Sequence, residues 1–311
     1  MTATDTQSPW RWPQDAVRFL RATVTNQLAR FAPNSYVRLT GETGRGREAV
    51  PPEEVAAYFR ECVADYRAQL TALGRDPDAV LRDARILEYG PGDIPGVALL
   101  LIAQGAAKVV CVDRFPLVRT NLGSDPVLRA LEAELDRDAA RRFRAACEAG
   151  EGNTASLEYR IRPSGVSGEQ ASVDLILSRA VLEHVNDLDA TFGDMRAALR
   201  PGGLAMHKVD LRSHGLHNRN RLDFLRWPAW AWRWMHSCKG TPNRIRLTEY
   251  RRLAERHQLE VLALSAVERA GMEEVHEVRP HLAAPFRDVP DEDLEVLSFW
   301  LILRKPDMSE G

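Results

Sequence analysis

The sequence predicts an α/β protein built on a doubly wound, largely parallel sheet. Apolar, strand-like runs alternate with helical segments from residue 85 to residue 305, a pattern typical of a sheet covered by helices on both faces. A glycine-rich turn directly follows the first of these runs. The stretch before it has apolar residues at helical spacing. We therefore expect a helical N-terminal cap (1–80) followed by a sheet domain (81–311).

The expected elements follow in order along the chain. Helices are predicted over 16–31 and 52–73, the second opening with prolines and glutamates, which favour a helix start. Further helices are predicted over 97–106, 125–149, 189–199 and 247–257. Short apolar runs predict the strands, namely ARILEYG, KVVCVDRF, LEYRIRP, SVDLILS, GLAMHKVDL, LEVLALSAV and SFWLILRK.

Composition narrows the classes of function. Hydrophobic residues make up 44% and charged residues 28%, which excludes a disordered or low-complexity chain. A formal net charge of -2 disfavours a nucleic-acid partner. The longest purely apolar run, 97–103, is far shorter than the ~18 residues that a membrane span needs, so we expect no membrane partner. Four scattered cysteines without a CxxC pair favour reduced thiols, a cytoplasmic location and no zinc site.

The strongest local signal is the turn ILEYGPGDIPG (86–96), placed between a strand and a helix. Its glycines let the backbone approach a ligand closely, and free amides at the helix start face the ligand's polar groups. Asp113 stands 21 positions after Gly92, at the end of the next strand, where a carboxylate can accept two ribose hydroxyls. The nicotinamide fingerprint has a shorter glycine spacing, and Asp93 would repel a pyrophosphate. The turn therefore favours a sulfonium cofactor over a nicotinamide or a turn without ligand.

Four segments, LEYGPGD, VVCVDRF, VDLILSRAVLEHV and LRPGG, stand in a characteristic order and spacing. Through them the chain resembles class I S-adenosylmethionine (SAM)-dependent methyltransferases over about residues 80–305. More narrowly, it resembles a bacterial branch associated with methylation of glycans or specialised metabolites. The resemblance implies a Rossmann-like fold with seven strands, the last antiparallel.

The same resemblance implies a set of cofactor contacts. Glu88, Gly90 and Gly92 are expected to line the methionine end of the cofactor, and Asp113 to hold the ribose hydroxyls. Arg114 and Phe115 are expected beside the adenine, and Ser178 and Arg179 at the sulfonium end. Tyr36 and Arg38 are expected to fold over the cofactor, because such enzymes often close the site with N-terminal elements. The family usually has an acidic or polar residue after the third strand to meet the adenine amine; this chain has RPSGVSGE there, and no residue is assigned to that contact. His184 and Glu183 are interpreted as packing elements.

The substrate side is expected around HKVDLRSHGLH, at the carboxyl edge where open α/β sheets bind ligands. His207, Asp210 and His214 are the candidate catalytic residues, forming a base oriented by a carboxylate. Two alternatives remain open for them, a metal site of two histidines and one carboxylate, and purely structural roles. Because successive strand residues point to opposite faces, His207 and Asp210 converge only if the strand ends near Val209.

An insertion over 212–246 is rich in tryptophan and arginine. Trp227, Trp230 and Trp234 stand at helical spacing. One interpretation is a lid that accepts an anionic or sugar-like substrate, and the other is a set of cap helices with a solvated basic face.

We expect SAM-dependent methyl transfer to a small-molecule acceptor, by in-line displacement with a histidine base and without a metal. A hydroxyl is favoured over an amine as the accepting group, and the acceptor is expected to be sugar-like or a specialised metabolite. Three alternatives stay open. They are a SAM-using cyclisation or aminopropyl transfer, a non-catalytic SAM-binding protein, and a nicotinamide oxidoreductase.

Overall fold

A computed structural model describes residues 12–32, 35, 50–92, 94–114, 125–148, 154–214, 220–236, 238 and 242–307. Two compact units divide the chain. Unit 1 comprises 1–42, 211–248 and 267–298, and unit 2 comprises 43–210, 249–266 and 299–311. This division differs from a boundary near residue 80, because the helix over 52–72 packs into the core of the sheet. No helix in the described ranges is both long and apolar enough to cross a membrane.

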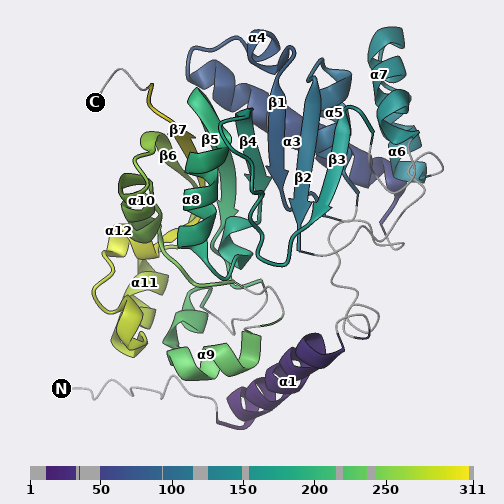
Figure 1. Cartoon of the computed structure of the whole chain (residues 1–311). Helices are drawn as coiled ribbons and strands as arrows, with labels where there is room; N and C mark the ends of the chain where they lie inside the picture. The colour runs from purple at the N-terminus through teal and green to yellow at the C-terminus, as the bar shows by residue number, and fades with distance from the viewer. Residues whose placement is uncertain are drawn as a thin grey trace. The chain divides into compact units, whose positions relative to one another are not determined.

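Seven strands form one sheet in the order β3-β2-β1-β4-β5-β7-β6 (Figure 1). Their bounds are β1 Arg85–Tyr89, β2 Lys108–Asp113, β3 Leu157–Ile161, β4 Val173–Arg179, β5 Leu199–Asp210, β6 Glu260–Arg269 and β7 Val296–Arg304. Strands β1 to β5 pair in parallel. Backbone hydrogen bonds join Gly203 to Lys305 and Leu211 to Leu297, so β7 runs antiparallel to β5. The seven-stranded, Rossmann-like sheet with an antiparallel last strand is thereby confirmed.

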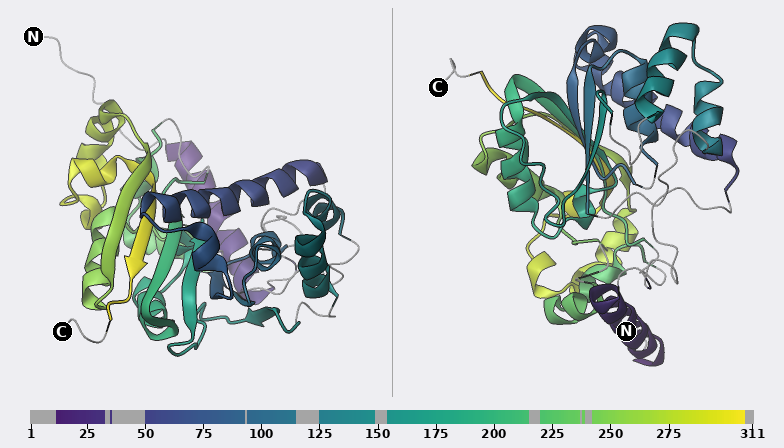
Figure 2. Two further views of the ribbon diagram at one scale, coloured as in Figure 1. Left: turned by 90° about the horizontal axis from the view of Figure 1, so that it is seen from above. Right: turned by 45° about the vertical axis from the view of Figure 1, so that its right-hand side comes forward.

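Helices cover both faces of the sheet (Figure 2). Those of unit 2 are α3 Pro52–Ala72, α4 Pro77–Leu81, α5 Gly96–Ala103, α6 Pro126–Glu132, α7 Arg137–Cys147, α8 Leu188–Ala198 and most of α10 Leu247–Arg256, with the 3-10 turn η3 Leu182–His184. On one face, α3, α5, α6 and α7 bury alternate strand residues in a single apolar core. On the other, Phe192 of α8 and Phe299 of β7 both contact the ring of Tyr250 of α10 edge-on.

Aspartates begin several of these helices. Asp125 and Asp136 each accept hydrogen bonds from backbone amides of the first turn, at 2.8 Å for Val127 and for Ala139. Asp187 does the same for Ala190 at 2.9 Å. Because the first amides of a helix have no partner within it, each such cap stabilises the helix by roughly 1 kcal/mol.

Unit 1 has its own apolar core. Its elements are α1 Trp12–Phe31, η4 Asp223–Arg226, α9 Ala229–His236, α11 Met272–Val278, η5 Arg279–His281, η6 Ala284–Phe286 and α12 Asp291–Leu294. Trp227, Trp230 and Trp234 stand at helical spacing in the sequence but do not share one helix. Trp227 follows η4 and is buried, whereas Trp230 and Trp234 on α9 are 64% and 56% exposed, because Pro228 separates the two elements.

Candidate active site

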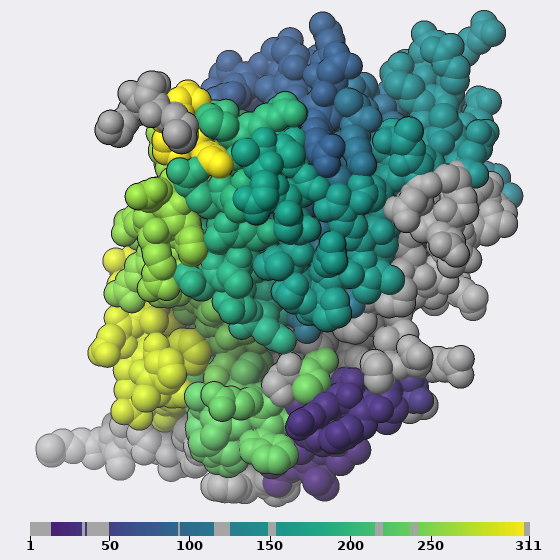
Figure 3. Space-filling view, viewed as in Figure 1, coloured from purple at the N-terminus to yellow at the C-terminus, as the bar shows by residue number. Residues whose placement is uncertain are grey.

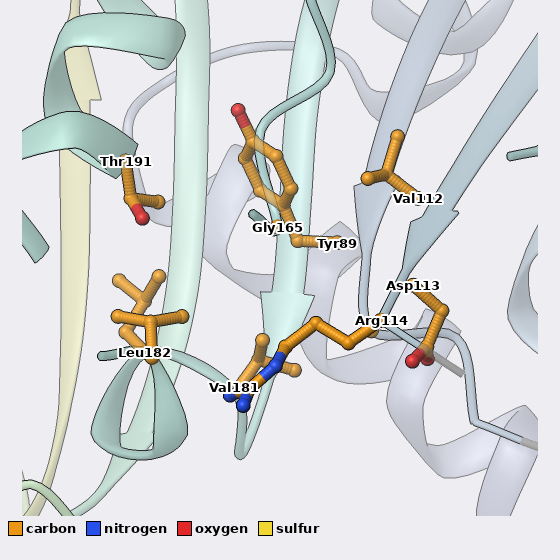
Figure 4. Close-up of a pocket in the computed structure, with 10 residues that line it drawn as sticks. Tyr89, Val112, Asp113, Arg114, Gly165, Val181, Leu182 and Thr191 are labelled. Atoms are coloured by element: carbon orange, nitrogen blue, oxygen red, sulfur yellow. The ribbon is translucent and has the colours of Figure 1, made fainter. Parts of the chain in front are cut away.

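A cavity of about 370 Å³, including its open mouth, lies at the carboxyl ends of β1 and β2 (Figure 4). Its lining is mostly apolar and combines the ends of these strands with the segments after β3 and β4. The lining residues are Tyr89, Gly90, Val112, Asp113, Arg114, Gly165, Val181, Leu182, Val185 and Thr191. Apolar walls with a few polar groups at one side are typical of a site for a small heterocyclic ligand.

The two glycines of the turn adopt backbone conformations that other residues rarely take. Gly90 has φ +62°, and a Cβ there would lie 2.5 Å from Cγ2 of Val181. Gly92 has φ +77° with no atom within 4 Å of its Cβ position, so its backbone borders open space. At Gly96, by contrast, a Cβ would lie 2.4 Å from the Phe59 ring. Gly92 therefore leaves the backbone accessible, whereas Gly90 lets Val181 pack closely against the turn and Gly96 lets α5 pack against α3.

Glu88 lies on β1, on the face covered by α3 and α5, and is only 7% exposed. Burial raises the pKa of its carboxyl to about 7, with the nearby Asp113 carboxylate acting in the same direction. Hydrogen bonds from the Cys111 thiol, 3.7 Å away, and from the Ala98 amide oppose this rise. A carboxyl that loses its proton near neutral pH binds a cationic ligand more strongly as the pH rises.

Asp113, the last residue of β2, and Arg114, which follows it, form the polar side of the cavity. Nη1 of Arg114 donates a hydrogen bond of 3.1 Å to the main-chain carbonyl of His184. Figure 4 shows the Arg114 side chain extending from the end of β2 toward Val181, across the carboxyl end of β1. The guanidinium thus joins the β2 edge to the segment that follows β4.

Ser178 and His207 occupy paired register positions at the ends of β4 and β5. Ser178 Oγ and His207 Nδ1 lie 2.7 Å apart, and both residues are buried. Burial lowers the pKa of His207 to about 3, so its imidazole is neutral at physiological pH. Its Nε2 has no hydrogen-bond partner among the described residues. This geometry does not favour direct removal of a proton from an acceptor, which requires access to the ring.

Arg179 and Lys208 are paired one position further along, on the opposite face of the sheet. Both donate to Oδ2 of Asp65 on α3, at 2.6 Å and 3.0 Å. Burial raises the pKa of Asp65, but the hydrogen bonds from the two cations outweigh it and hold that pKa below its usual value. The arginine also lies over the Tyr58 ring at 5.4 Å. Two cations thus share one carboxylate at the carboxyl edge.

The remaining predicted catalytic residues fall in different compact units, Asp210 in unit 2 and His214 in unit 1. Asp210 ends β5, so His207 and Asp210 keep the alternation of a strand and the condition for their convergence is not met. His214 belongs to unit 1 and has φ +49°. Tyr36, Arg38, Asp93 and Phe115 lie outside the described residues.

Sequence reasoning missed most of the cavity wall. The segment AVLEHV supplies Val181, Leu182 and Val185. In its sequence the charged residues indicate chemistry more conspicuously than the apolar residues around them do. Gly165 comes from RPSGVSGE, and its φ of +77° explains a glycine there. Tyr89 follows Glu88 on the other face of β1, where its hydroxyl donates to Asp194. These residues could be found in the sequence only by their positions at or after the ends of strands, because their side chains do not themselves indicate a cofactor site.

The geometry fits S-adenosylmethionine. The open backbone at Gly92 provides a cradle that a Cβ would narrow, Asp113 provides a carboxylate at the polar side, and the apolar walls suit an adenine ring. Glu88 provides a buried carboxyl at the end of the same strand as the glycine turn.

Several known proteins are similar to this chain. The family model described as a methyltransferase domain matches residues 56–264. No curated protein sequence matches the chain. A solved SAM-dependent methyltransferase from Mesorhizobium loti is 17% identical, with 72% of this chain and 92% of that chain covered and a TM-score of 0.42. Phosphoethanolamine N-methyltransferase 2 from Haemonchus contortus, solved with SAM, is 15% identical, with 73% and 49% covered and a TM-score of 0.42.

The matched segment spans 209 residues (264 − 56 + 1), or about two thirds of the 311-residue chain. It includes the glycine turn, the cavity and the paired strand ends of β4 and β5. The chain therefore belongs to the methyltransferase-domain family and is a class I enzyme that uses S-adenosylmethionine.

Proposed function

We propose that this methyltransferase acts on a hydroxyl of a small acceptor that carries an acidic or sugar-like group. The observation that supports this most is the pair Arg179 and Lys208, which share the single carboxylate of Asp65 at the ends of β4 and β5. Ligands of open α/β sheets bind outside the carboxyl ends of the strands. Two cations there, paired with Asp65 and, for Arg179, also with Glu61 at 3.7 Å, keep further hydrogen-bond donors for an anionic acceptor.

The cofactor is assigned to the cavity at β1 and β2. Asp113 accepts the ribose hydroxyls, Arg114 lies beside the adenine, and the Gly90 and Gly92 backbone admits the methionine end, with Glu88 beneath it. When bound, SAM supplies a methyl group on a positively charged sulfur that leaves as a neutral thioether. Ser178 and Arg179 are the other proposed cofactor contacts in the described structure. Three more proposed contacts, Tyr36, Arg38 and Phe115, lie outside the described residues.

A hydroxyl nucleophile needs a base within hydrogen-bond reach. Because His207 is completely buried, its role in this proposal is to hold Ser178 in one orientation through the 2.7 Å contact. The base is assigned to His214, which follows the end of β5 by four residues, with Asp210 at that strand end as the accompanying carboxylate. The sulfonium needs no activation, so in-line positioning and exclusion of water supply the rest of the rate.

Matched acceptors test the substrate class. Methyl-labelled SAM is incubated with the enzyme and with pairs of glycosides, each a uronic acid beside its neutral parent sugar. We expect label in the acid member of a pair, and loss of that preference in Lys208→Gln. Equal labelling of both members would refute the anionic acceptor. Formation of S-adenosylhomocysteine, rather than methylthioadenosine, separates methyl transfer from cyclisation and aminopropyl transfer.

The base assignment is tested separately, on whichever acceptor is labelled. Replacing His214 by alanine should lower kcat most at low pH, where a histidine base is protonated, and leave cofactor binding unchanged. Replacing His207 by asparagine should instead weaken cofactor binding and lower stability together, because the partner of Ser178 changes. A His214 variant with an unaltered pH profile would contradict its role as base.

The N-terminal cap and the 212–246 lid also remain proposals. Residues 211–248 fall in the same compact unit as 1–42, and that unit has an apolar core of its own. A separate apolar core is typical of a unit that can fold by itself, and we propose that this unit carries the lid.

A further inference from the structure

Helix α1 of unit 1 is packed with its apolar side outward. Its buried positions are small or polar, namely Asp15, Ala22, Asn26 and Ala29. Asp15 forms an ion pair of 2.8 Å with Arg226, whose side chain is also buried. Asn26 donates to the carbonyl of Trp234 and accepts from the amide of Cys238. The inward face of this helix therefore carries small and polar residues, together with Phe19, which packs against the apolar core of unit 1.

The outward face of α1 carries an apolar stripe. Val17, Leu20, Val24 and Phe31 are 67%, 65%, 60% and 75% exposed, and their spacing places them on one side of a helix. Leu28, which is half-buried, lies in the same stripe. Single exposed apolar residues are ordinary, but a stripe along a whole helix indicates a surface that binds something.

Helix α9 extends this surface with two tryptophans. It lies beside α1, as Figure 3 shows for the purple and light green segments. Phe19 of α1 contacts the ring of Trp230, with centroids 6.1 Å apart. Trp230 and Trp234 are each more than half exposed. Tryptophan is the residue that prefers the boundary between an apolar phase and water.

The charges on this surface have one sign. Arg21, Arg30 and Arg233 are exposed on the two helices. Over 14–31 and 229–236, where side chains are described, the only acidic residue is the buried Asp15. An interfacial helix that binds anionic lipid combines arginines with large apolar and aromatic residues in this way.

We propose that the exposed surface of α1 and α9 binds an anionic membrane surface, with the apolar stripe and the two tryptophans entering the headgroup boundary. A symmetric contact with a second copy of the chain is less favourable, because it would bring the same arginines together without an acidic partner. This proposal departs from the sequence-based expectation of no membrane partner.

Co-sedimentation of the full chain with lipid vesicles tests the proposal. One set of vesicles is phosphatidylcholine, and the other is an equal mixture of phosphatidylcholine and phosphatidylglycerol. Each basic residue near an anionic surface strengthens binding by about fivefold, so three arginines predict roughly a hundredfold preference for the anionic vesicles. High salt should reduce this preference, because it screens surface charge.

Variants separate this surface from general stickiness. The double variant Leu20→Glu, Trp230→Glu should lose at least tenfold in binding, and Arg21→Gln with Arg233→Gln should lose most of the preference for anionic lipid. Val267→Glu is the matched control, because Val267 is 52% exposed on β6, and it should bind as the unaltered protein does.

Three results would overturn the proposal. They are absence of vesicle binding, equal binding by the double variant, and a dimer in sedimentation velocity that Leu20→Glu dissociates while vesicles are not bound. The last result would assign the surface to a second copy of the chain.

Discussion

Replacing Glu88 by glutamine should stabilise the protein at alkaline pH and weaken cofactor binding. Burial raises the pKa of this carboxyl from 4.5 to about 7. Between these two values the folded state holds a proton that the unfolded state releases. The contribution of Glu88 to the free energy of unfolding is therefore intact below pH 4.5 and is lost as the pH rises to about 7. The difference of about 2.5 pKa units, at about 1.4 kcal/mol per unit, amounts to roughly 3 kcal/mol. Glutamine has the same shape and no charge to bury.

Denaturant unfolding at pH 5 and at pH 8.5 measures this directly. Glu88→Gln should exceed the unaltered protein in unfolding free energy by up to about 3 kcal/mol at the higher pH and by much less at the lower one. Glu158→Gln serves as control. Hydrogen bonds from Arg160 and Lys108 lower the pKa of Glu158 to about 2, so its loss should destabilise the protein at the higher pH. A Glu88→Gln variant less stable at pH 8.5 would refute the reasoning.

Three further predictions concern the glycine turn and two buried polar contacts. Gly90→Ala should cost more than about 1 kcal/mol and abolish binding of S-adenosylhomocysteine, whereas Gly92→Ala, with open space around it, should cost less; thermal unfolding and calorimetric titration check both. Ser178→Ala leaves the Nδ1 of His207 without its partner and should cost about 1–3 kcal/mol, measured by urea unfolding. Asp15→Ala removes the carboxylate that forms a buried ion pair with Arg226 and should cost about 3–5 kcal/mol, visible as an earlier unfolding transition in calorimetry.

Much of the fold follows from local patterns in the sequence. The run ARILEYG forms β1 and KVVCVDRF forms β2, because continuous apolar residues between turn signals suit a strand buried on both faces. The helices over 12–31 and 52–72 match their predicted ranges closely. The compact units were not predictable in the same way, since they join segments that are far apart in the chain.

The candidate site was predictable where backbone conformation dictates residue type. Gly90 and Gly92 have positive φ, a conformation that two closely spaced glycines between a strand and a helix already indicate. His207 shows the opposite case. Its position at the carboxyl edge suggested a base, but burial and the contact with Ser178 depend on strand register, which local sequence does not specify. The outward apolar face of α1 was not predictable either, because periodicity does not tell which side of a helix faces the protein.

Calorimetric titration with S-adenosylhomocysteine tests most directly the claim that the cavity at β1 and β2 holds the cofactor. The unaltered protein should bind one equivalent with micromolar affinity, and NADH should give no heat. Asp113→Ala removes the carboxylate at the polar side of the cavity and should weaken binding at least tenfold while the protein stays folded. Equal affinity in Asp113→Ala, or a stoichiometric response to NADH, would contradict the assignment.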